Sequence, residues 1–315
     1  MIITRMSATS GPESAPAGLV VACHGRHLRL RIAGGAEVAA RPARRALEVV
    51  CGDEVEVRHD AQHDEWHVIG VRPRRTALYR SDARGAGELV AANVGLLLVV
   101  LAARPRSDPF IADRYLAAAA SEHIDACVVA NKRDLDADAE LDAALAGLQL
   151  AGYRVLDCSA RTGAGLDALR AAIGTRTAML VGESGVGKSS LTRVLVPHSE
   201  VEVGELARDR GGRHTTTAVR LYDLPGGGRL LDAPGVRDFA PAIDRLDAAT
   251  LGFVEVARLA GGCRFADCRH LAEPGCAVRA ASESGAMDPR RYESYRRLRR
   301  LHAGLTARQG ERRRS

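Results

Sequence analysis

Residues 182–189 read Gly182-Glu183-Ser184-Gly185-Val186-Gly187-Lys188-Ser189 and match the phosphate-binding pattern Gly-x4-Gly-Lys-Ser/Thr. An apolar stretch, 178–181, precedes them and a helical pattern starts at Ser190, which is the strand–loop–helix context that the motif requires. Glycines let backbone N–H groups turn toward phosphate oxygens, and the start of a helix adds favourable partial charge. We expect Lys188 to reach the β- and γ-phosphates and the Ser189 hydroxyl to bind Mg²⁺. The motif predicts a nucleotide site but does not separate ATP from GTP.

The stretch Asn131-Lys132-Arg133-Asp134 is typical of a guanine-recognition loop and directly follows the apolar residues 126–130. The Asp134 carboxylate can accept hydrogen bonds from the N1–H and the exocyclic amine of guanine. Adenine has no donor at either place and would leave the carboxylate unpaired, which is costly in a closed pocket. Lys132 can lay its stem across the base, and Ser159-Ala160, after the next predicted strand, offers a backbone N–H for guanine O6. A polar loop after a strand is the alternative reading of an isolated four-residue match.

Asp232-Ala233-Pro234-Gly235 follows the apolar stretch 229–231 and matches the loop that senses magnesium and the γ-phosphate in GTPases. We expect Asp232 to hold Mg²⁺ through a water molecule and the Gly235 N–H to contact the γ-phosphate. Upstream, residues 211–217 read Gly-Gly-Arg-His-Thr-Thr-Thr and are a candidate first switch, in which Thr216 is expected to complete the magnesium shell. A flexible polar loop is the alternative, and it is compatible with a switch that orders only around the γ-phosphate.

The residue after Gly235 bears on hydrolysis. Many GTPases place there a Gln that orients the attacking water, whereas this chain has Val236, whose side chain forms no hydrogen bond. His214, in the candidate first switch, is the nearest catalytic candidate by motif, because an imidazole there could orient the water or stabilise charge. This role requires the switch to fold over the γ-phosphate, so we expect slow intrinsic turnover. The alternative is that His214 only shapes the switch.

Around these motifs, residues 76–240 alternate apolar strands with helical patterns. The predicted strands are 94–101, 126–130, 155–157, 178–181, 219–222 and 229–231, and the predicted helices include 111–122, 141–150 and 166–173. This alternation is typical of an α/β domain with a doubly wound sheet. Residues 18–71 instead contain short alternating stretches separated by turn residues, which favours a small β-barrel. A β-sheet appendage of another kind is the alternative for that region.

The guanine-nucleotide motifs occur in a rotated order along the chain. An ordinary small GTPase runs from the phosphate loop through the two switches to Asn-Lys-x-Asp and Ser-Ala, whereas here the two base-recognition motifs come first. The same sheet can form from a chain that is cut and rejoined elsewhere, which is tolerated when the old termini lie close together. The chain then leaves the GTPase domain soon after the second switch. Whatever follows is therefore tethered to the element that senses the γ-phosphate.

A cysteine–histidine cluster lies further along the chain. Cys263, Cys268, His270 and Cys276 offer three thiolates and one imidazole within fourteen residues. Four nitrogen and sulfur ligands predict a closed tetrahedral Zn²⁺ site, whose role is structural. Three buried thiols and a surface His are the alternative, although such a small, aromatic-poor segment would have difficulty ordering itself without metal.

The net charge of +6 is unevenly placed. Residues 288–315 hold ten Arg against three acidic residues, so the rest of the chain is nearly neutral. Six of these arginines recur on a helical pattern with Tyr and Leu: Arg290, Arg291, Arg296, Arg297, Arg299 and Arg300. We expect this helix to contact RNA phosphates; a solvated helix face is the alternative.

The sequence also indicates the cellular compartment of the protein. No segment reaches the length of a membrane span, and residues 1–17 lack the features of a signal peptide and read as a flexible leader. Seven Cys, three of them clustered with a His, indicate a reducing compartment rather than a disulfide framework. We therefore expect a cytoplasmic protein with no membrane partner.

Together these features closely resemble the RsgA/YjeQ family of GTPases that depend on the small ribosomal subunit. Besides the motifs above, the resemblance is carried by Ala91-Ala92-Asn93, Asp113-Arg114-Tyr115-Leu116 and the residues from Cys263 to Val278. It implies an α/β fold with three parts. These are an N-terminal OB-fold over 18–75, a circularly permuted GTPase domain over 76–240 and a C-terminal zinc-binding domain with a basic helix over 241–315.

The resemblance also implies a function. Such a GTPase hydrolyses GTP to GDP and phosphate, is stimulated by the small ribosomal subunit, contacts its rRNA and assists its late maturation; we expect it to act as a monomer. The family's nucleotide-binding residues carry over to Asn131, Lys132, Arg133, Asp134, Gly182, Glu183, Ser184, Gly185, Val186, Gly187, Lys188, Ser189 and Ser190. Its zinc ligands carry over to the four residues of the cysteine–histidine cluster.

Two other classes of function remain open. One is a P-loop kinase or ATPase, against which residues 131–134 argue; competition between GTP and ATP would decide. The other is a nucleic-acid-binding protein that uses nucleotide only for stability, which turnover with and without purified small subunits would test.

Overall fold

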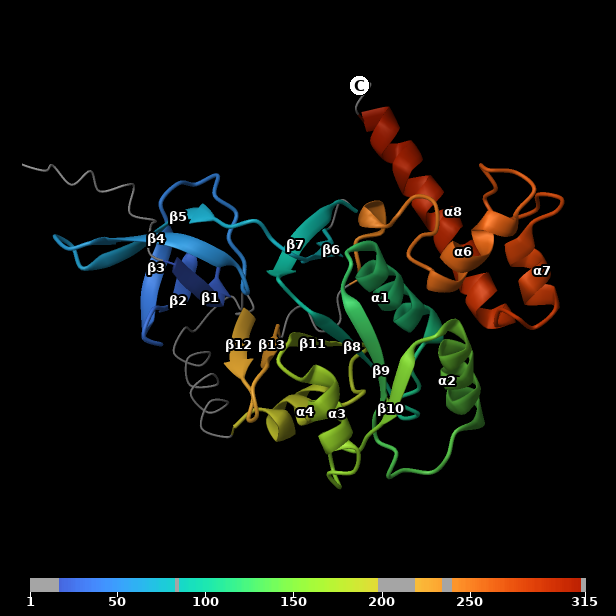
Figure 1. Cartoon of the computed structure of the whole chain (residues 1–315), viewed down its shortest axis with the longest axis horizontal. Coiled ribbons are helices and arrows are strands. Elements are labelled where there is room, and N and C mark those ends of the chain that lie inside the picture. The colour runs from blue at the N-terminus through green and yellow to red at the C-terminus, as the bar shows by residue number, and fades with distance from the viewer. Residues whose placement is uncertain (1–16, 83–84, 198–218, 234–239, 313–315) are drawn as a thin grey trace, which may run out of the picture.

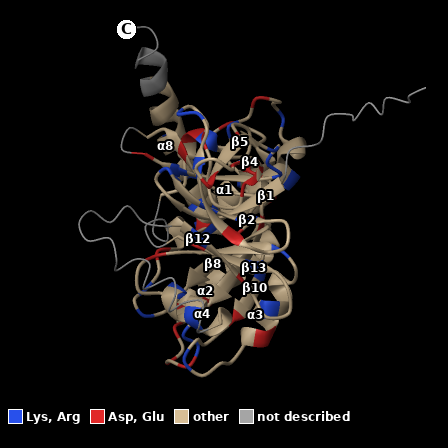
Figure 2. Ribbon diagram, turned by 90° about the vertical axis from the view of Figure 1, so that its left-hand side faces the viewer, with Lys and Arg blue, Asp and Glu red and all other residues tan. Residues whose placement is uncertain are grey.

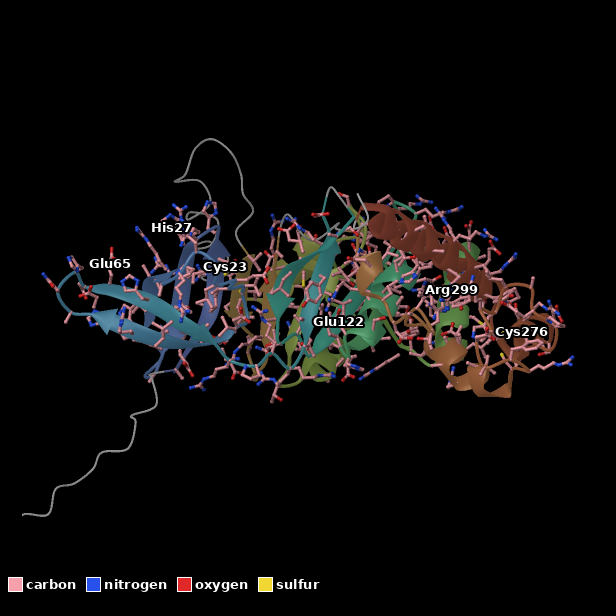
Figure 3. All side chains as sticks on the ribbon, turned by 90° about the horizontal axis from the view of Figure 1, so that it is seen from above. Cys23, His27, Glu65, Glu122, Cys276 and Arg299 are labelled. Atoms are coloured by element: carbon pink, nitrogen blue, oxygen red, sulfur yellow. The ribbon has the colours of Figure 1, made fainter. Side chains whose placement is uncertain are left out.

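The computed structural model describes residues 17–82, 85–197, 219–233 and 240–312, with side chains as far as residue 307. Along the chain, a barrel is followed by a sheet that carries helices on both faces, and then by a group of C-terminal helices (Figure 1). The barrel and the C-terminal helices lie at opposite ends of the molecule, where Figure 3 labels His27 and Cys276 respectively. Every helix in the described ranges is too short or too polar to serve as a transmembrane span.

Five short strands form the N-terminal barrel. They are β1 (Ala17–His24), β2 (His27–Ile32), β3 (Glu37–Pro42), β4 (Glu54–Asp60) and β5 (Glu65–Val71). They pair in the order β1-β2-β3-β5-β4, and β4 also pairs with β1, which closes the barrel. Inward-facing aliphatic side chains, among them Val20, Leu30 and Val68, fill its interior. The barrel expectation is confirmed, but the pattern does not predict β3, because Ala39 and Ala40 carry no β-branched or aromatic side chain.

Within the described residues the central sheet has six strands, each within two residues of a predicted one. They are β8 (Leu96–Leu101), β9 (Asp125–Ala130), β10 (Arg154–Asp157), β11 (Thr177–Val181), β12 (Val219–Asp223) and β13 (Arg229–Asp232). Their order is β10-β9-β8-β11-β13-β12, with all neighbours parallel except the antiparallel pair of β12 and β13. All of β8 is buried, as expected of a parallel strand covered on both faces.

Helices cover both faces of the central sheet, which confirms the doubly wound α/β class. They are α1 (Pro109–Ser121), α2 (Ala139–Ala151), α3 (Leu166–Ile173) and α4 (Lys188–Leu195). Leu116 of α1 and Leu148 of α2 belong to the core on one face, whereas Leu169 of α3 and Leu191 of α4 belong to the core on the other.

A hairpin that the sequence pattern does not predict connects the barrel to the central sheet. It consists of β6 (Ala77–Ser81) and β7 (Gly87–Ala92). The hairpin contacts the segment that follows the Asp232–Gly235 motif, since the Ser81 N–H donates to the Ala240 carbonyl over 2.9 Å. That segment continues into the short 3-10 helix η1 (Ile243–Arg245).

The barrel and the central sheet are also hydrogen-bonded to each other directly. β1 pairs antiparallel with β12 through Ala22 opposite Arg220 and Cys23 opposite Val219, so the two parts share one eleven-stranded sheet. Arg31 of β2 forms an ion pair of 2.7 Å with Asp223 of β12. Because β12 directly follows the candidate first switch in sequence, the barrel is attached to a strand next to that switch.

The C-terminal region packs on α1. It contains α6 (Val254–Leu259), the 3-10 helix η2 (Ala260–Gly262), α7 (Ala277–Glu283) and α8 (Pro289–Arg312). Its core joins Phe253 and Tyr295 to Phe110 and Ala117 of α1. This region is therefore held on the central sheet by a shared apolar core.

Arg291 corrects one expectation from the sequence. Its side chain is 1% exposed and lies between two buried carboxylates, 2.7 Å from Asp113 of α1 and 2.7 Å from Glu255 of α6. Arg290 also pairs with Asp113 over 2.7 Å. The prediction of RNA contact is therefore wrong for Arg291, which faces the core because a paired guanidinium satisfies both buried charges there. Arg300, further along α8, has a side chain that is 58% exposed.

Candidate nucleotide site and metal site

The phosphate loop joins the end of β11 to the start of α4, as predicted. Gly187 has a backbone φ of 101°, and a Cβ at this position would lie 2.3 Å from Nδ2 of Asn131. Only glycine fits so close to the Asn131 side chain. The buried Lys188 side chain folds back over the loop, with Nζ donating to the carbonyls of Gly182 at 2.7 Å and Glu183 at 2.5 Å. Val186 is buried, whereas Ser184, Ser189 and Ser190 are exposed. Gly182, Gly185 and Gly187 all have positive φ, a backbone conformation that glycine adopts readily.

Asn131 ties the phosphate loop to the two base-recognition loops. It lies at the end of β9 and is 2% exposed. Its Nδ2 donates to the Val186 carbonyl at 2.9 Å, and its Oδ1 accepts from the Ala160 N–H at 3.2 Å. Lys132 adds a second tie, because Nζ donates to the Gly185 carbonyl at 2.6 Å. Three loops that are distant in sequence therefore meet at the carboxyl edge of the parallel strands.

Asp134 is held as a charged acceptor. One carboxylate oxygen accepts a short hydrogen bond from the Ser159 hydroxyl, and the other accepts from Nε of Arg161 at 2.6 Å. The Ser159 hydrogen bond and the Arg161 charge lower the pKa of Asp134, so this side chain is ionised at neutral pH. The Arg133 side chain instead forms ion pairs with Asp142 at 2.8 Å and Asp157 at 2.9 Å. Arg133 therefore attaches the 131–134 loop to α2 and to the end of β10.

Sequence reasoning missed two residues beside this site. Arg161 follows Ser159-Ala160 directly, and its contact with Asp134 could have been suspected from that position alone. Pro105 follows β8 and carries no motif, but a Cβ on Gly185 would lie 2.9 Å from its Cγ. The β8 loop therefore packs against the phosphate loop. Only the fold reveals this contact, because it depends on β8 and β11 being neighbours.

The residues predicted for magnesium and for hydrolysis are only partly described. Asp232 ends β13 and is 5% exposed, and Ser189 lies in the first turn of α4. Both thus lie at the same sheet edge as the phosphate loop. His214, Thr216 and Gly235 lie outside the described residues.

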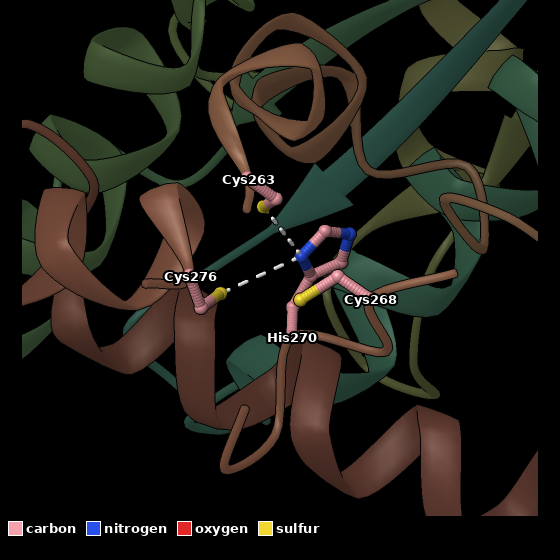
Figure 4. Close-up of side chains that lie close together, drawn as sticks. All are labelled: Cys263, Cys268, His270 and Cys276. Atoms are coloured by element: carbon pink, nitrogen blue, oxygen red, sulfur yellow. Dashed lines mark hydrogen bonds between the residues drawn. The ribbon is translucent and has the colours of Figure 1, made fainter. Parts of the chain in front are cut away.

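The cysteine–histidine cluster is assembled in the C-terminal region. Candidate ligand atoms of Cys263, Cys268, His270 and Cys276 all lie within 4.8 Å of one another. Nδ1 of His270 is 3.4 Å from Sγ of Cys263 and 3.6 Å from Sγ of Cys276 (Figure 4). Burial and the nearby Arg299 lower the pKa of His270, which favours the neutral imidazole that binds metals. These four groups could hold a metal ion.

The loop around the cluster is fixed from two sides. Tyr292 of α8 donates its hydroxyl to the His270 carbonyl at 2.9 Å, and Tyr295 donates to the Arg269 carbonyl at 3.0 Å. Burial disfavours the charged form of Glu273, but backbone N–H groups, including those of Arg269 and Leu271, outweigh it and lower its pKa to about 2. The loop that carries Arg269, His270 and Glu273 therefore packs on α8.

Comparison with known proteins agrees with this geometry. The family model of the RsgA GTPase matches residues 71–241. A relative in Saccharophagus degradans, "Small ribosomal subunit biogenesis GTPase RsgA", is 38% identical over 312 residues, covering 94% of this chain and 90% of the relative. The protein of the same name in Azotobacter vinelandii is 41% identical over 297 residues, covering 91% and 85%.

Two solved structures share the fold. The crystal structure of YjeQ from Thermotoga maritima has a TM-score of 0.71 and 25% identity, covering 92% of this chain and 99% of that one. YloQ, described as a circularly permuted GTPase, has a TM-score of 0.68 and 21% identity, covering 97% and 99%. The matches and the rotated motifs that meet at one sheet edge show that this chain belongs to the RsgA family of circularly permuted GTPases.

Proposed function

We propose that this chain binds the small ribosomal subunit, assists its late maturation, and hydrolyses GTP to GDP and phosphate at a rate that the subunit stimulates. The observation that carries the proposal is the junction at Asn131, which hydrogen-bonds both the phosphate loop and the second base-recognition loop. The partner is inferred from the relatives, which are named small ribosomal subunit biogenesis GTPases. We further propose a cytoplasmic monomer with no membrane partner.

Each part of the nucleotide has a proposed set of contacts. Backbone N–H groups of 182–190 bind the phosphates and Lys188 supplies positive charge, while the Gly235 N–H contacts the γ-phosphate. Asp134 reads guanine with Lys132 over the base plane, and the Ser159-Ala160 backbone contacts O6. The proposed magnesium ligands are Ser189, Thr216 and Asp232. When bound with GTP, Mg²⁺ neutralises charge that develops on the phosphates.

The two ends of the molecule are proposed to bind the subunit. We assign residues 18–75 to an OB-fold, 76–240 to the GTPase domain and 241–315 to a zinc-binding domain, with 1–17 as a leader. An OB-fold is a common RNA-binding module, and the exposed arginines of α8, such as Arg300, can contact phosphates. The cysteine–histidine cluster is proposed to hold one structural Zn²⁺, because its four ligands leave no open position.

Turnover assays with ribosomal particles test this function directly. Purified small subunits should raise GTP turnover well above the intrinsic rate, whereas large subunits alone should not. Excess ATP should leave a bound fluorescent guanine nucleotide in place, because adenine leaves Asp134 unpaired. Equal turnover with and without small subunits would contradict the proposal, and displacement by ATP would favour the kinase or ATPase class.

His214→Ala is expected to abolish most of the stimulated hydrolysis. Since Val236 cannot orient water, the reaction needs another group, and His214 is proposed to reach the γ-phosphate when subunit docking orders the first switch. The variant should bind GTP and small subunits normally, while its rate at saturating subunit falls toward the intrinsic rate. Retained stimulation would point to a catalytic group that the ribosome supplies.

Removing zinc should unfold the C-terminal region and leave the central sheet able to bind nucleotide. Ligand thiolates that lose their metal no longer hold the loop, so Cys268→Ser should reproduce the effect. Far-UV circular dichroism and limited proteolysis would report the loss, and nucleotide titration would report the intact site. Cys23→Ser, at a thiol outside the cluster, is the control. Protein purified without chelators that contains no zinc would contradict the ligand assignment.

A further inference from the structure

The strand β12 joins the barrel to a residue of the nucleotide site. Ala22 of β1 lies opposite Arg220 of β12, and Arg220 lies opposite Asp232 of β13. These residues form one line across three neighbouring strands, and the line ends at a proposed magnesium ligand. Figures 1 and 2 both place β12 between β1 and β13. Because each step in the line is a backbone ladder, a shift of β1 acts on β12 and through it on β13.

A chain of charged side chains makes the same connection. Glu37 of β3 pairs with Arg31 of β2 at 3.3 Å, and Arg31 pairs with Asp223 of β12 at 2.7 Å. Asp223 in turn pairs with Arg229 of β13 at 3.4 Å. Opposite charges therefore alternate from the barrel to the strand that ends at Asp232. Asp223 is the member that links the two parts, since it contacts an arginine on each side.

The junction of β1 and β12 is weak enough to rearrange. The side chain of Asp223 is 48% exposed and that of Arg31 is 25% exposed, and ion pairs that solvent reaches stabilise a fold only slightly. Arg220 is 3.8 Å from Glu37, and its Nε is buried without a hydrogen-bond partner among the described residues. A buried donor without a partner costs stability, so a second arrangement of the junction can compete with this one.

The barrel has a firmer attachment at the end of the β6–β7 hairpin. The Ala92 N–H donates to the Cys51 carbonyl at 3.0 Å, and Nδ2 of Asn93 donates to the Gly52 carbonyl at 2.9 Å. Asp53, which is 0% exposed, accepts from Nε and a terminal nitrogen of Arg74 at 2.7 and 2.9 Å. A buried, doubly bonded ion pair of this kind resists motion. Rotation of the barrel about this attachment would therefore act on the looser contact at β12.

We propose that the junction of β1 and β12 couples partner binding at the barrel to the nucleotide site, with Arg31 and Asp223 as its positioning residues. This inference rests on the proposed function, which places the small subunit on the barrel and GTP beside Asp232. A subunit that holds the barrel in one orientation favours one arrangement of β12, and hence one position of Asp232. Such coupling is reciprocal, so the bound nucleotide changes the affinity for the subunit by the same factor.

The test measures this coupling factor in the full-length protein. The affinity for purified small subunits is determined with a non-hydrolysable GTP analogue and with GDP, and the ratio of the two affinities is the readout. Asp223→Asn removes the central charge, Arg31→Gln breaks the same ion pair from the barrel side, and Asp223→Glu keeps the charge. Asp125→Asn is the matched control, because Asp125 forms an ion pair of 2.8 Å with Arg176 on β9, away from β12.

We expect Asp223→Asn and Arg31→Gln each to lower the affinity ratio about threefold to fivefold. The rate of GTP hydrolysis at saturating subunits should fall with it, whereas intrinsic turnover and melting temperature should stay near the wild-type values. Asp223→Glu and Asp125→Asn should keep the wild-type ratio. The double variant Arg31→Gln/Asp223→Asn should lose no more than the larger single effect, because both changes break one contact.

Three results would overturn the inference. One is a wild-type ratio in both Asp223→Asn and Arg31→Gln. Another is an equal loss of affinity with the GTP analogue and with GDP, since the ion pair would then only hold the barrel in place. The third is a fully additive loss in the double variant, which would show that the two side chains do not act through their mutual contact.

The wild-type protein separates this inference from the proposed function. If small subunits neither bind nor stimulate the wild type, the proposed function fails and the coupling fails with it. If the wild type is stimulated but binds subunits equally well with both nucleotides, the function stands and the coupling alone fails. The same holds if the wild type prefers one nucleotide form and both single variants keep that preference.

Discussion

Asp134→Asn is expected to lower the affinity for GTP by about 10²- to 10⁴-fold and to raise the affinity for xanthosine triphosphate. Each hydrogen bond to a charged acceptor is worth about 1.5–3 kcal/mol, and two such bonds to guanine correspond to that range of Kd. Xanthine carries a carbonyl where guanine has its exocyclic amine, so the Asn amide can donate to it. The base preference should therefore reverse rather than simply weaken.

The surroundings of Asp134 fix its hydrogen-bonding state. Ser159 and Arg161 hold the two carboxylate oxygens and keep the pKa of Asp134 low, so the wild-type residue is an acceptor only. Asp136→Asn is a matched control, because Asp136 lies on the same loop with a side chain that is 90% exposed. Titrations with fluorescent guanine and xanthine nucleotides give both affinities. A variant of Asp134 that keeps full preference for GTP would show that another residue reads the base.

The convergence of the nucleotide motifs at one sheet edge could be predicted from the sequence, because these motifs lie in loops after strands. Parallel strands bring their carboxyl ends to one edge, so Asn131, Asp134 and Lys188 had to meet once the strands were placed. The rotated order did not disturb this argument, since it depends on which strand each motif follows. The grouping of the cysteine–histidine cluster could also be predicted, because its four residues lie within one short segment.

What the sequence could not give are the contacts between distant elements. The pairing of β1 with β12 involves only two residue pairs, and no composition signal marks Ala22 or Cys23 as partners of a GTPase strand. The sequence also did not show which arginines of α8 would be buried and which would be exposed. Arg291 and Arg300 have the same chemistry and both lie on one helix, yet one is buried and the other exposed, because only Arg291 faces Asp113 and Glu255.

This difference changes how the C-terminal arginines must be tested. Deleting residues 290–315 would remove nearly all of α8, including Tyr295 and Leu298 of the shared core. The loss of subunit binding after such a deletion would report unfolding as much as lost RNA contacts. Single replacements of exposed arginines avoid this problem, and Arg300 is suited to them.

Arg291→Met is expected to lower the free energy of unfolding of the C-terminal region by about 3–5 kcal/mol, the usual cost of removing one partner from a buried ion pair. Burial alone would lower the pKa of Arg291, but the charges of Asp113 and Glu255 outweigh it and raise that pKa above its ordinary value. Methionine preserves much of the side-chain length and the helix propensity. The loss should therefore come from two carboxylates left buried without a full partner.

Two further variants separate charge from packing. Arg300→Met, the same change at an exposed position of the same helix, should cost less than about 1 kcal/mol because its ion pair is solvated. Adding Asp113→Asn and Glu255→Gln to Arg291→Met removes both stranded charges and should recover part of the loss. Urea unfolding followed by circular dichroism reports the helices, whereas fluorescence of Trp66, the single tryptophan, reports the barrel. If the triple variant is as unstable as the single one, or if the Trp66 transition shifts as far as the helical one, the ion-pair network is not what fastens the C-terminal region to α1.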